Sequence, residues 1–238
     1  MIFFYSFLIF SLGVCLGSFA NVCIYRLPKN KQIVSGRSFC PKCKKKIKWY
    51  DNLPLISFII LNRKCRNCNK VISLRYITVE LITGVVFLLI YLNFNNFNTI
   101  VFLSILSLIF IIIFFIDLEN FIIPDSLNFT IMGLALFKNF LPHFNTSLTH
   151  EINQSIIGGM VGYSSIWLII FLYKTFKKID GMGLGDAKLM AGIGLLFGWQ
   201  SIPFVLFVSA ILGLIFVLPS LLNKQKNMRS EIPFGPFI

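Results

Sequence analysis

Long apolar runs alternate with short polar segments along this chain of 238 residues. A helix needs about 17 to 25 predominantly apolar residues to cross a bilayer. Runs of about this length lie at residues 2–24, 78–93, 99–116, 121–141, 154–173 and 201–222, and a shorter run lies at 187–199. The pattern predicts an all-α polytopic membrane protein, a bundle of about seven transmembrane helices.

The composition agrees with this fold class. Hydrophobic residues make up 56% of the chain and charged residues only 13%, whereas about a quarter of the residues of a soluble domain are charged. A mean hydropathy of +0.81 also excludes a disordered or nucleic-acid-coating protein, in spite of the net charge of +13. The first run has no basic residues before it and no clear cleavage site, so we expect a retained helix rather than a removed signal peptide.

Basic residues are concentrated in one polar segment, residues 25–77, which holds 14 of the 22 Lys and Arg and a single acidic residue, Asp51. Because apolar runs flank this segment, the positive-inside rule explains its charge better than nucleic-acid binding does. We therefore expect a first transmembrane helix at 1–24, a basic cytoplasmic loop at 25–77 and a transmembrane core at 78–238. The lipid bilayer is the expected partner, and no nucleic acid is expected.

Counting crossings from a cytoplasmic loop predicts the orientation of the rest of the chain. The N-terminus lies outside, and every later basic cluster falls in the cytoplasm, with only Lys138 outside. The short run 187–199 is counted as a crossing because the cluster Lys224, Lys226 and Arg229 would otherwise lie outside. The count places Asp117 and Asp186 at the same, cytoplasmic, face.

Four of the six cysteines form two C-x-x-C pairs, which are Cys40 with Cys43 and Cys65 with Cys68. Two such turns can hold one zinc ion tetrahedrally through four thiolates. The reducing cytoplasm disfavours a disulfide here, and a redox pair would not need a second pair. The spacing predicts a structural zinc site that staples the cytoplasmic loop, because four thiolates leave no open coordination position. We expect Cys15 and Cys23 to be packing residues.

Two carboxylates stand beside apolar runs where burial is costly. Asp117 follows the run that ends at Ile116, and Asp186 ends the sequence Gly183-Leu184-Gly185-Asp186. Two carboxylates in a partly dry cleft share a proton, so one polarises water for attack on a peptide carbonyl while the other stays protonated. Gly183 and Gly185 would allow positive φ and a close approach of substrate backbone. Asp125 and Asp180 are read as helix N-caps, whereas the helix dipole disfavours an anion at the position of Asp117.

Motifs along nearly the whole chain resemble those of the type IV prepilin peptidases, membrane aspartic proteases of the GxGD class. These motifs are Gly17–Val22 with Tyr25–Pro28, the cysteine pairs around Asp51–Leu55, Ile72–Tyr76 with Glu80, Asp117 with Pro124 and Asp125, Gly181–Lys188, and Ile232–Pro236.

The resemblance implies a bacterial inner-membrane peptidase that cleaves the short basic leader of a prepilin or pseudopilin at the cytoplasmic face. Asp117 and Asp186 would be the catalytic pair, and Asp125 and Lys188, with Gly183 and Gly185, would support them. Related chains usually continue past residue 236 into a further apolar helix, and we expect the bundle to be looser without one.

The resemblance also implies a second activity, methylation of the new N-terminus with S-adenosylmethionine as donor. No G-x-G-x-x-G turn is present, so the donor site is not of the Rossmann type. Glu80 and Gly84, where the loop meets the next helix, are our candidates for its position.

Two other classes of function fit some of these features. A non-enzymatic scaffold of pilus or secretion machinery would use the zinc loop to bind a partner, with the aspartates as caps. A transporter would use intramembrane carboxylates to carry protons or cations, although transport sites lie near the midplane rather than at one face.

Overall fold

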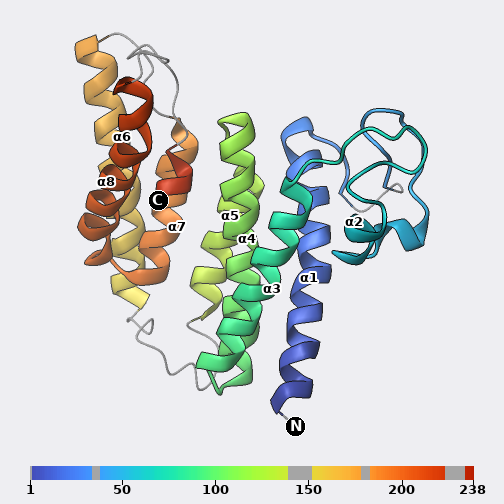
Figure 1. The fold of residues 1–238 in the computed structure, drawn as a ribbon. Coiled ribbons are helices and arrows are strands. Elements are labelled where there is room, and N and C mark those ends of the chain that lie inside the picture. The colour runs from blue at the N-terminus through green and yellow to red at the C-terminus, as the bar shows by residue number, and fades with distance from the viewer. Residues whose placement is uncertain (1, 34–37, 139–151, 178–182, 223–233) are drawn as a thin grey trace. The chain divides into compact units, whose positions relative to one another are not determined.

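The computed structural model describes residues 2–33, 38–138, 152–177, 183–222 and 234–238 (Figure 1). Within them the secondary structure is helical, apart from two isolated antiparallel bridges. The helices are α1 (Ile2–Arg26), η1 (Leu27–Lys29), η2 (Trp49–Asn52), α2 (Ile56–Ile60), α3 (Arg75–Asn93), α4 (Phe97–Asn120), α5 (Asp125–Phe137), α6 (Ile152–Lys177), α7 (Leu184–Phe197), α8 (Ser201–Leu222) and η4 (Gly235–Phe237).

Five of the described helices are long and apolar enough to cross a membrane, so the chain is a multi-pass membrane protein. The candidate spans are Phe3–Lys29, Arg75–Asn93, Phe97–Asn120, Ile152–Phe176 and Ser201–Leu218. They confirm five of the predicted crossings. The spans carry many exposed apolar side chains, such as Phe204, Phe207 and Phe216 on α8, as expected of surfaces that face lipid.

The predicted crossings at 121–141 and 187–199 correspond to shorter helices. With 13 residues in α5 and 14 in α7, each is about 20 Å long at 1.5 Å per residue. Within the predicted run 121–141 the helix begins only at Asp125. Phe121, directly after α4, has a φ of 56°, and Pro124 has an extended conformation before the first turn of α5. Residues 139–141 lie outside the described part of the chain.

The chain divides into two compact units, residues 1–112 and 113–238, and α4 contributes to both. In the first unit α1 packs along α3 (Figure 1). The two helices approach closely because glycines face each other. A Cβ on Gly13 would lie 2.9 Å from the Cα of Gly84, and one on Gly17 would lie 2.8 Å from the Cα of Glu80. Small residues allow this close packing of membrane helices.

In the second unit α7 packs against both α5 and α6. Gly158 of α6 meets Gly194 of α7 backbone to backbone. Most of α7 is buried, and Ala187 and Met190 form a core with Ile166 of α6 and Ile202 of α8. A short helix that is buried on several sides provides a rigid support for the carboxylate in its first turn.

Candidate active site and four-cysteine cluster

Asp117 lies in the last turn of α4 and is only 4% exposed. The backbone N–H of Gly235 interacts with its carboxylate. Its Oδ2 atom is buried without a hydrogen-bond partner among the described residues. A buried acceptor without a partner is costly in a structural role, so this oxygen is available to a water molecule or a substrate.

Asp186 lies in the first turn of α7 and is 8% exposed. Its carboxylate accepts the N–H of Gly183, and its own N–H donates to the Gly183 carbonyl at 3.2 Å. Gly183 is the N-cap residue, so the first of these bonds is the one that a carboxylate makes in a capping box. Burial, and secondarily the negative charge of Asp117, raises the pKa of Asp186 to about 7. The two carboxylates are therefore close enough to repel each other.

Three backbone segments meet around this pair. Gly235 of the C-terminal segment lies against Asp117, since a Cβ there would stand 2.7 Å from Asp117 Oδ2 and 2.9 Å from Ile123 Cδ1. A Cβ on Gly185 would stand 3.2 Å from Ile123 Cβ. Ile123, in the connection between α4 and α5, thus contacts the surroundings of both aspartates.

The expected positive φ of the two motif glycines is wrong. Gly183 has a φ of −80°, and Gly198 is the only glycine with positive φ in the part of the chain that the structure describes. These glycines matter because they have no side chain beside the carboxylate. The nearest atom to a Cβ on Gly183 would be Asp186 Oδ2 at 3.7 Å, so the backbone at Gly183 borders the carboxylate directly.

The N-terminal end of α5 is tied to the N-terminal end of α7. Lys188 Nζ lies 2.7 Å from Asp125 Oδ1, and the buried Asn128 donates from Nδ2 to the Gly185 carbonyl at 3.3 Å. The interpretation of Asp125 as an N-cap is wrong, because Pro124 occupies the N-cap position and α5 has no side-chain cap. Asp125 instead forms an ion pair across the two helices. Asp180 lies outside the described residues.

The four cysteines come together as the spacing predicts. The Sγ atoms of Cys40, Cys43, Cys65 and Cys68 all lie within 4.8 Å of one another. Zinc–sulfur bonds of about 2.3 Å in a tetrahedron separate the sulfurs by about 3.8 Å, so the donor set fits a zinc ion after small movements. The pKa of Cys65 is lowered to about 7, mainly by the N–H of Asn67 and then by that of Cys68. In spite of the N–H of Lys70, burial and the neighbouring cysteines raise the pKa of Cys68 to about 11, so the thiols of the cluster do not ionise alike.

The two cysteine turns share one backbone design. In the first, Cys40 N–H donates to Lys45 O and Lys44 N–H to Cys40 O. In the second, Cys65 N–H donates to Lys70 O and Asn69 N–H to Cys65 O. The residue after each second cysteine, Lys44 or Asn69, has positive φ, 58° and 53°. Such matched turns present their thiols to one point.

Polar contacts fasten this loop to itself and to α3. The guanidinium of Arg66 binds Asp51 through two nitrogens, with Nη2 at 2.7 Å from Oδ1. Glu80 of α3 is buried, and its Oε2 accepts the N–H of Leu55 at 2.9 Å. Asp51 and Leu55 lie in the middle of the segment between the cysteine pairs, so this segment is anchored there to the second cysteine turn and to α3.

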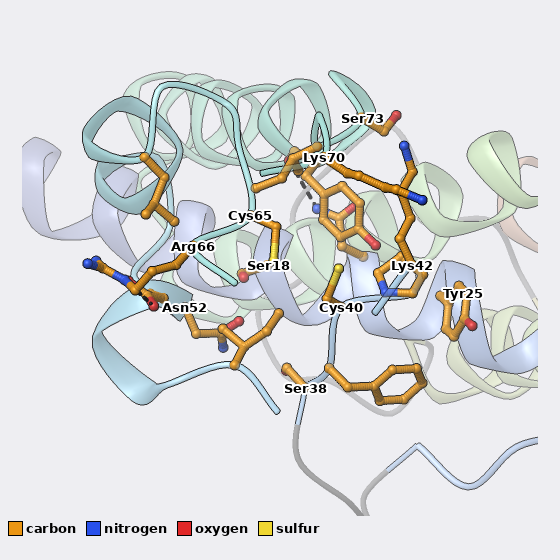
Figure 2. A pocket seen from close by; sticks show the side chains of 18 of the residues that line it. Ser18, Tyr25, Ser38, Cys40, Lys42, Asn52, Cys65, Arg66, Lys70 and Ser73 are labelled. Atoms are coloured by element: carbon orange, nitrogen blue, oxygen red, sulfur yellow. Dashed lines mark hydrogen bonds and ion pairs between the residues drawn. The ribbon is translucent and has the colours of Figure 1, made fainter. Parts of the chain in front are cut away.

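A cavity of about 490 Å³ lies between the cysteine loop and the helices α1 and α3 (Figure 2). Residues of all three contribute to its wall, among them Asn21, Cys65 and Glu80. Gly84, the second candidate for donor binding, does not line it, and packs instead against Val14 and Phe10 of α1.

Comparisons with known proteins agree over both units. Residues 11–94 match the bacterial peptidase A24 N-terminal domain, and residues 103–218 match the type IV leader peptidase family. A prepilin leader peptidase/N-methyltransferase of Vibrio cholerae is 38% identical, covering 95% of this chain and 90% of the relative. Enzymes of the same name from Neisseria gonorrhoeae and Aeromonas salmonicida are 32% and 30% identical, covering 94% and 98% of this chain and 84% and 87% of the relatives.

The fold and these matches together define a polytopic membrane peptidase. The chain belongs to the type IV leader peptidase family, that of the prepilin leader peptidase/N-methyltransferases. No solved structure matches the chain significantly.

The structure brings the predicted site residues into three groups, one of which is the cluster of four cysteines. Asp117 and Asp186 lie together with Gly183 and Gly185, and Asp125 joins Lys188 beside them. Sequence reasoning missed Asn128, although a polar residue one turn after Asp125 inside an apolar run is a visible signal.

Proposed function

We propose that Asp117 and Asp186 are the catalytic pair of an aspartic endopeptidase that removes the basic leader of type IV prepilins or pseudopilins. The observation that carries the proposal is the position of two buried carboxylates from different helices, each bordered by a glycine, with Ile123 beside the glycines of both. The family membership of the chain supports the same activity.

The chemistry follows from the unequal surroundings of the two groups. Asp186 keeps its proton near neutral pH, because its pKa is raised to about 7 by burial and by the charge of Asp117. Asp117, as the carboxylate, takes a proton from a water molecule that attacks the peptide carbonyl. Asp186 donates its proton to the carbonyl oxygen, as in other aspartic dyads.

The substrate would approach as an extended backbone beside the glycines. Gly183 and Gly235 border the two carboxylates without side chains. Asp125 remains 58% exposed although it pairs with Lys188, so its charge still reaches solvent and can attract a basic leader. Asp125→Lys should then weaken cleavage, and unchanged kinetics would contradict docking at this residue.

We place the site at the cytoplasmic face of the bacterial inner membrane, with the N-terminus outside. This requires about seven crossings, with the short helices α5 and α7 counted as spans. The first transmembrane helix would be residues 1–24, the cytoplasmic zinc loop 25–77 and the peptidase core 78–238.

The cysteine cluster would hold one structural zinc ion through Cys40, Cys43, Cys65 and Cys68. The donor set supports zinc, since four thiolates are the ligands of closed structural sites. The zinc ion would join the two cysteine turns and so give the loop a fixed shape. A second activity, N-methylation of the new N-terminus with S-adenosylmethionine, is supported by the names of the relatives.

Cleavage of a prepilin in membranes tests the peptidase. We expect Asp117→Asn and Asp186→Asn each to abolish cleavage while the protein stays inserted and keeps its zinc. Ser126→Asn, an exposed change near the start of α5, is the matched control and should cleave normally. Cleavage that survives either aspartate change would exclude that residue from the catalytic pair.

A further inference from the structure

The short helices η2 and α2 of the cysteine loop expose apolar side chains. Trp49 is 79% exposed, and Ile59 and Ile60 are 68% and 67% exposed. Since α2 packs against η2, these side chains belong to one region of the loop. Exposed apolar surface of this kind marks an interaction site. We call the region the apolar patch, and its members are Trp49, Tyr50, Leu53, Ile56, Ile59 and Ile60.

The start of α2 lies level with the first turns of α3 rather than beyond them. Leu55, the residue before α2, donates its N–H to Glu80 Oε2 at 2.9 Å, and Glu80 lies five residues after the start of α3 at Arg75. Glu80 also packs on α1 at Gly17, which lies nine residues before the end of that helix. Figure 1 shows α2 level with the middle part of α1. The loop therefore folds back along the two helices.

The length of α3 relates this position to the bilayer. At 1.5 Å per residue its 19 residues are about 28 Å long, close to the hydrocarbon thickness of about 30 Å. Because α3 is a candidate span, its first residue must lie at the edge of the hydrocarbon layer. A segment hydrogen-bonded more than one turn inside α3 lies near the same edge. Trp and Tyr, which begin the apolar patch, are the residues enriched at this depth.

The backbone holds α2 in place through turns of unusual conformation. Leu55 has a φ of 58°, which is rare for a residue with a large side chain and persists only where the surroundings hold it. The hydrogen bond to the buried Glu80 supplies that hold. After α2, Asn62 and Arg63 also have positive φ, 45° and 60°. The exposed face of α2 is therefore presented in a fixed direction.

Cations adjoin the apolar patch along the chain. Lys48 directly precedes η2, and its Nζ lies 5.5 Å from the centre of the Tyr50 ring. Asp51 is the only acidic residue of segment 25–77, and it is bound to Arg66. The loop therefore has a large excess of positive charge, which anionic headgroups attract. The other exposed lysines just before η2 are Lys42, Lys44, Lys45 and Lys46.

We propose that the apolar patch inserts into the headgroup boundary of the bilayer, on the side of the membrane where the cysteine loop lies. The lysines of residues 42–48 bind anionic phospholipid headgroups beside it. Apolar side chains at this depth, with cations next to them, are the two components of an interfacial membrane anchor. The anchor holds the cysteine loop against the membrane surface. Since all of these residues belong to residues 1–112, the inference is independent of the proposed catalytic pair.

Tryptophan quenching tests the insertion on the full chain in lipid nanodiscs. The chain has 3 tryptophans, so Trp167→Phe with Trp199→Phe leaves Trp49 alone. Lipids brominated near the headgroup end of the acyl chain should quench Trp49 strongly, and a water-soluble quencher should quench it weakly. The opposite result, in a chain whose unchanged Tm shows that it is folded, would overturn the proposal and leave the apolar patch free for a protein partner.

Two sets of variants in this background separate the apolar and the charged components. Ile59→Ser with Ile60→Ser should lower quenching by the brominated lipid by roughly half, because burial of each isoleucine favours insertion. Ile152→Ser changes an exposed isoleucine of α6 and, as the matched control, should leave the quenching unchanged. Equal quenching in the double variant would contradict insertion of α2.

Nanodiscs of phosphatidylcholine with and without phosphatidylglycerol test the headgroup contact. The anionic lipid should increase the quenching of Trp49, and Lys44→Gln, Lys45→Gln and Lys46→Gln together should remove the increase. Equal quenching of the unchanged lysine run in both lipids would contradict the headgroup contact.

Photoactivatable lipids give a readout on the unchanged chain. We expect lipid label in peptides that contain residues 49–60. Cross-links between two copies of the chain through these residues, in place of lipid label, would overturn the proposal by assigning the apolar patch to a second copy.

Discussion

Gly235 and Asp117 lie so close together that a Cβ atom on the glycine would stand 2.7 Å from Asp117 Oδ2. The glycine also supplies the backbone N–H that interacts with this carboxylate. The C-terminal segment is therefore part of the environment of Asp117. A chain segment distant in sequence thus limits where one proposed catalytic group can point.

Gly235→Ala should reduce prepilin cleavage by roughly 100-fold, because displacing a catalytic group by about 1 Å can cost that much. The added methyl group must push aside either Asp117 or Ile123, whose Cδ1 would be 2.9 Å away. Initial cleavage rates at matched expression measure the effect. Gly133→Ala is the control, because a Cβ there meets nothing within 4 Å. Normal cleavage by Gly235→Ala would show that this segment does not confine Asp117.

Cleavage should depend on pH through Asp186. Burial and the charge of Asp117 raise its pKa to about 7, so its proton is held below this pH and lost above it. Since the proposed mechanism uses that proton, kcat/KM should fall about tenfold per pH unit well above pH 7. Returning samples to pH 6 before assay separates titration from inactivation. A rate that stays constant from pH 6 to 9 would contradict the protonated role of Asp186.

Asn128 should act as a positioning residue for the turn that carries Asp186. Its Nδ2 bond to Gly185 O is 3.3 Å long, and losing it should lower kcat by roughly fivefold, as expected for about 1 kcal/mol. Asn128→Leu also removes Oδ1, which has no hydrogen-bond partner among the described residues, so thermal stability should change little. Thr130→Val, which removes an exposed hydroxyl bonded within α5, should leave both unchanged. A rise in KM alone, with kcat unchanged, would argue against a positioning role for Asn128.

Zinc removal should loosen the cysteine loop. Purified protein should contain about one zinc per chain, and a chelator should lower its Tm by roughly 5 °C or more, because the ion binds the folded loop and not the unfolded one. Cys40→Ser and Cys65→Ser should lose the metal, measured by mass spectrometry. Cys15→Ser changes an exposed cysteine and should keep it. Full zinc content in Cys65→Ser would contradict the four-thiolate site.

The sequence by itself determined the fold class, five of the crossings and the cysteine cluster. Each depends on a local pattern: apolar runs of bilayer length, and paired C-x-x-C spacings that only need to form two tight turns. The pairing of Asp117 with Asp186 could also be expected, because Asp117 follows one apolar run and Asp186 precedes another at one predicted face. The charge of Asp117 raises the pKa of Asp186, and the catalytic role of the pair stays a prediction.

Only the tertiary structure decided which groups surround these residues. Contacts such as Gly235 with Asp117, Asn128 with Gly185 and Lys188 with Asp125 join segments far apart in the chain. Spacing carries no information about them, because they depend on how closely whole helices pack. The same holds for the cavity beside the cysteine loop, whose wall is formed by segments far apart in the chain, among them those of Asn21, Cys65 and Glu80.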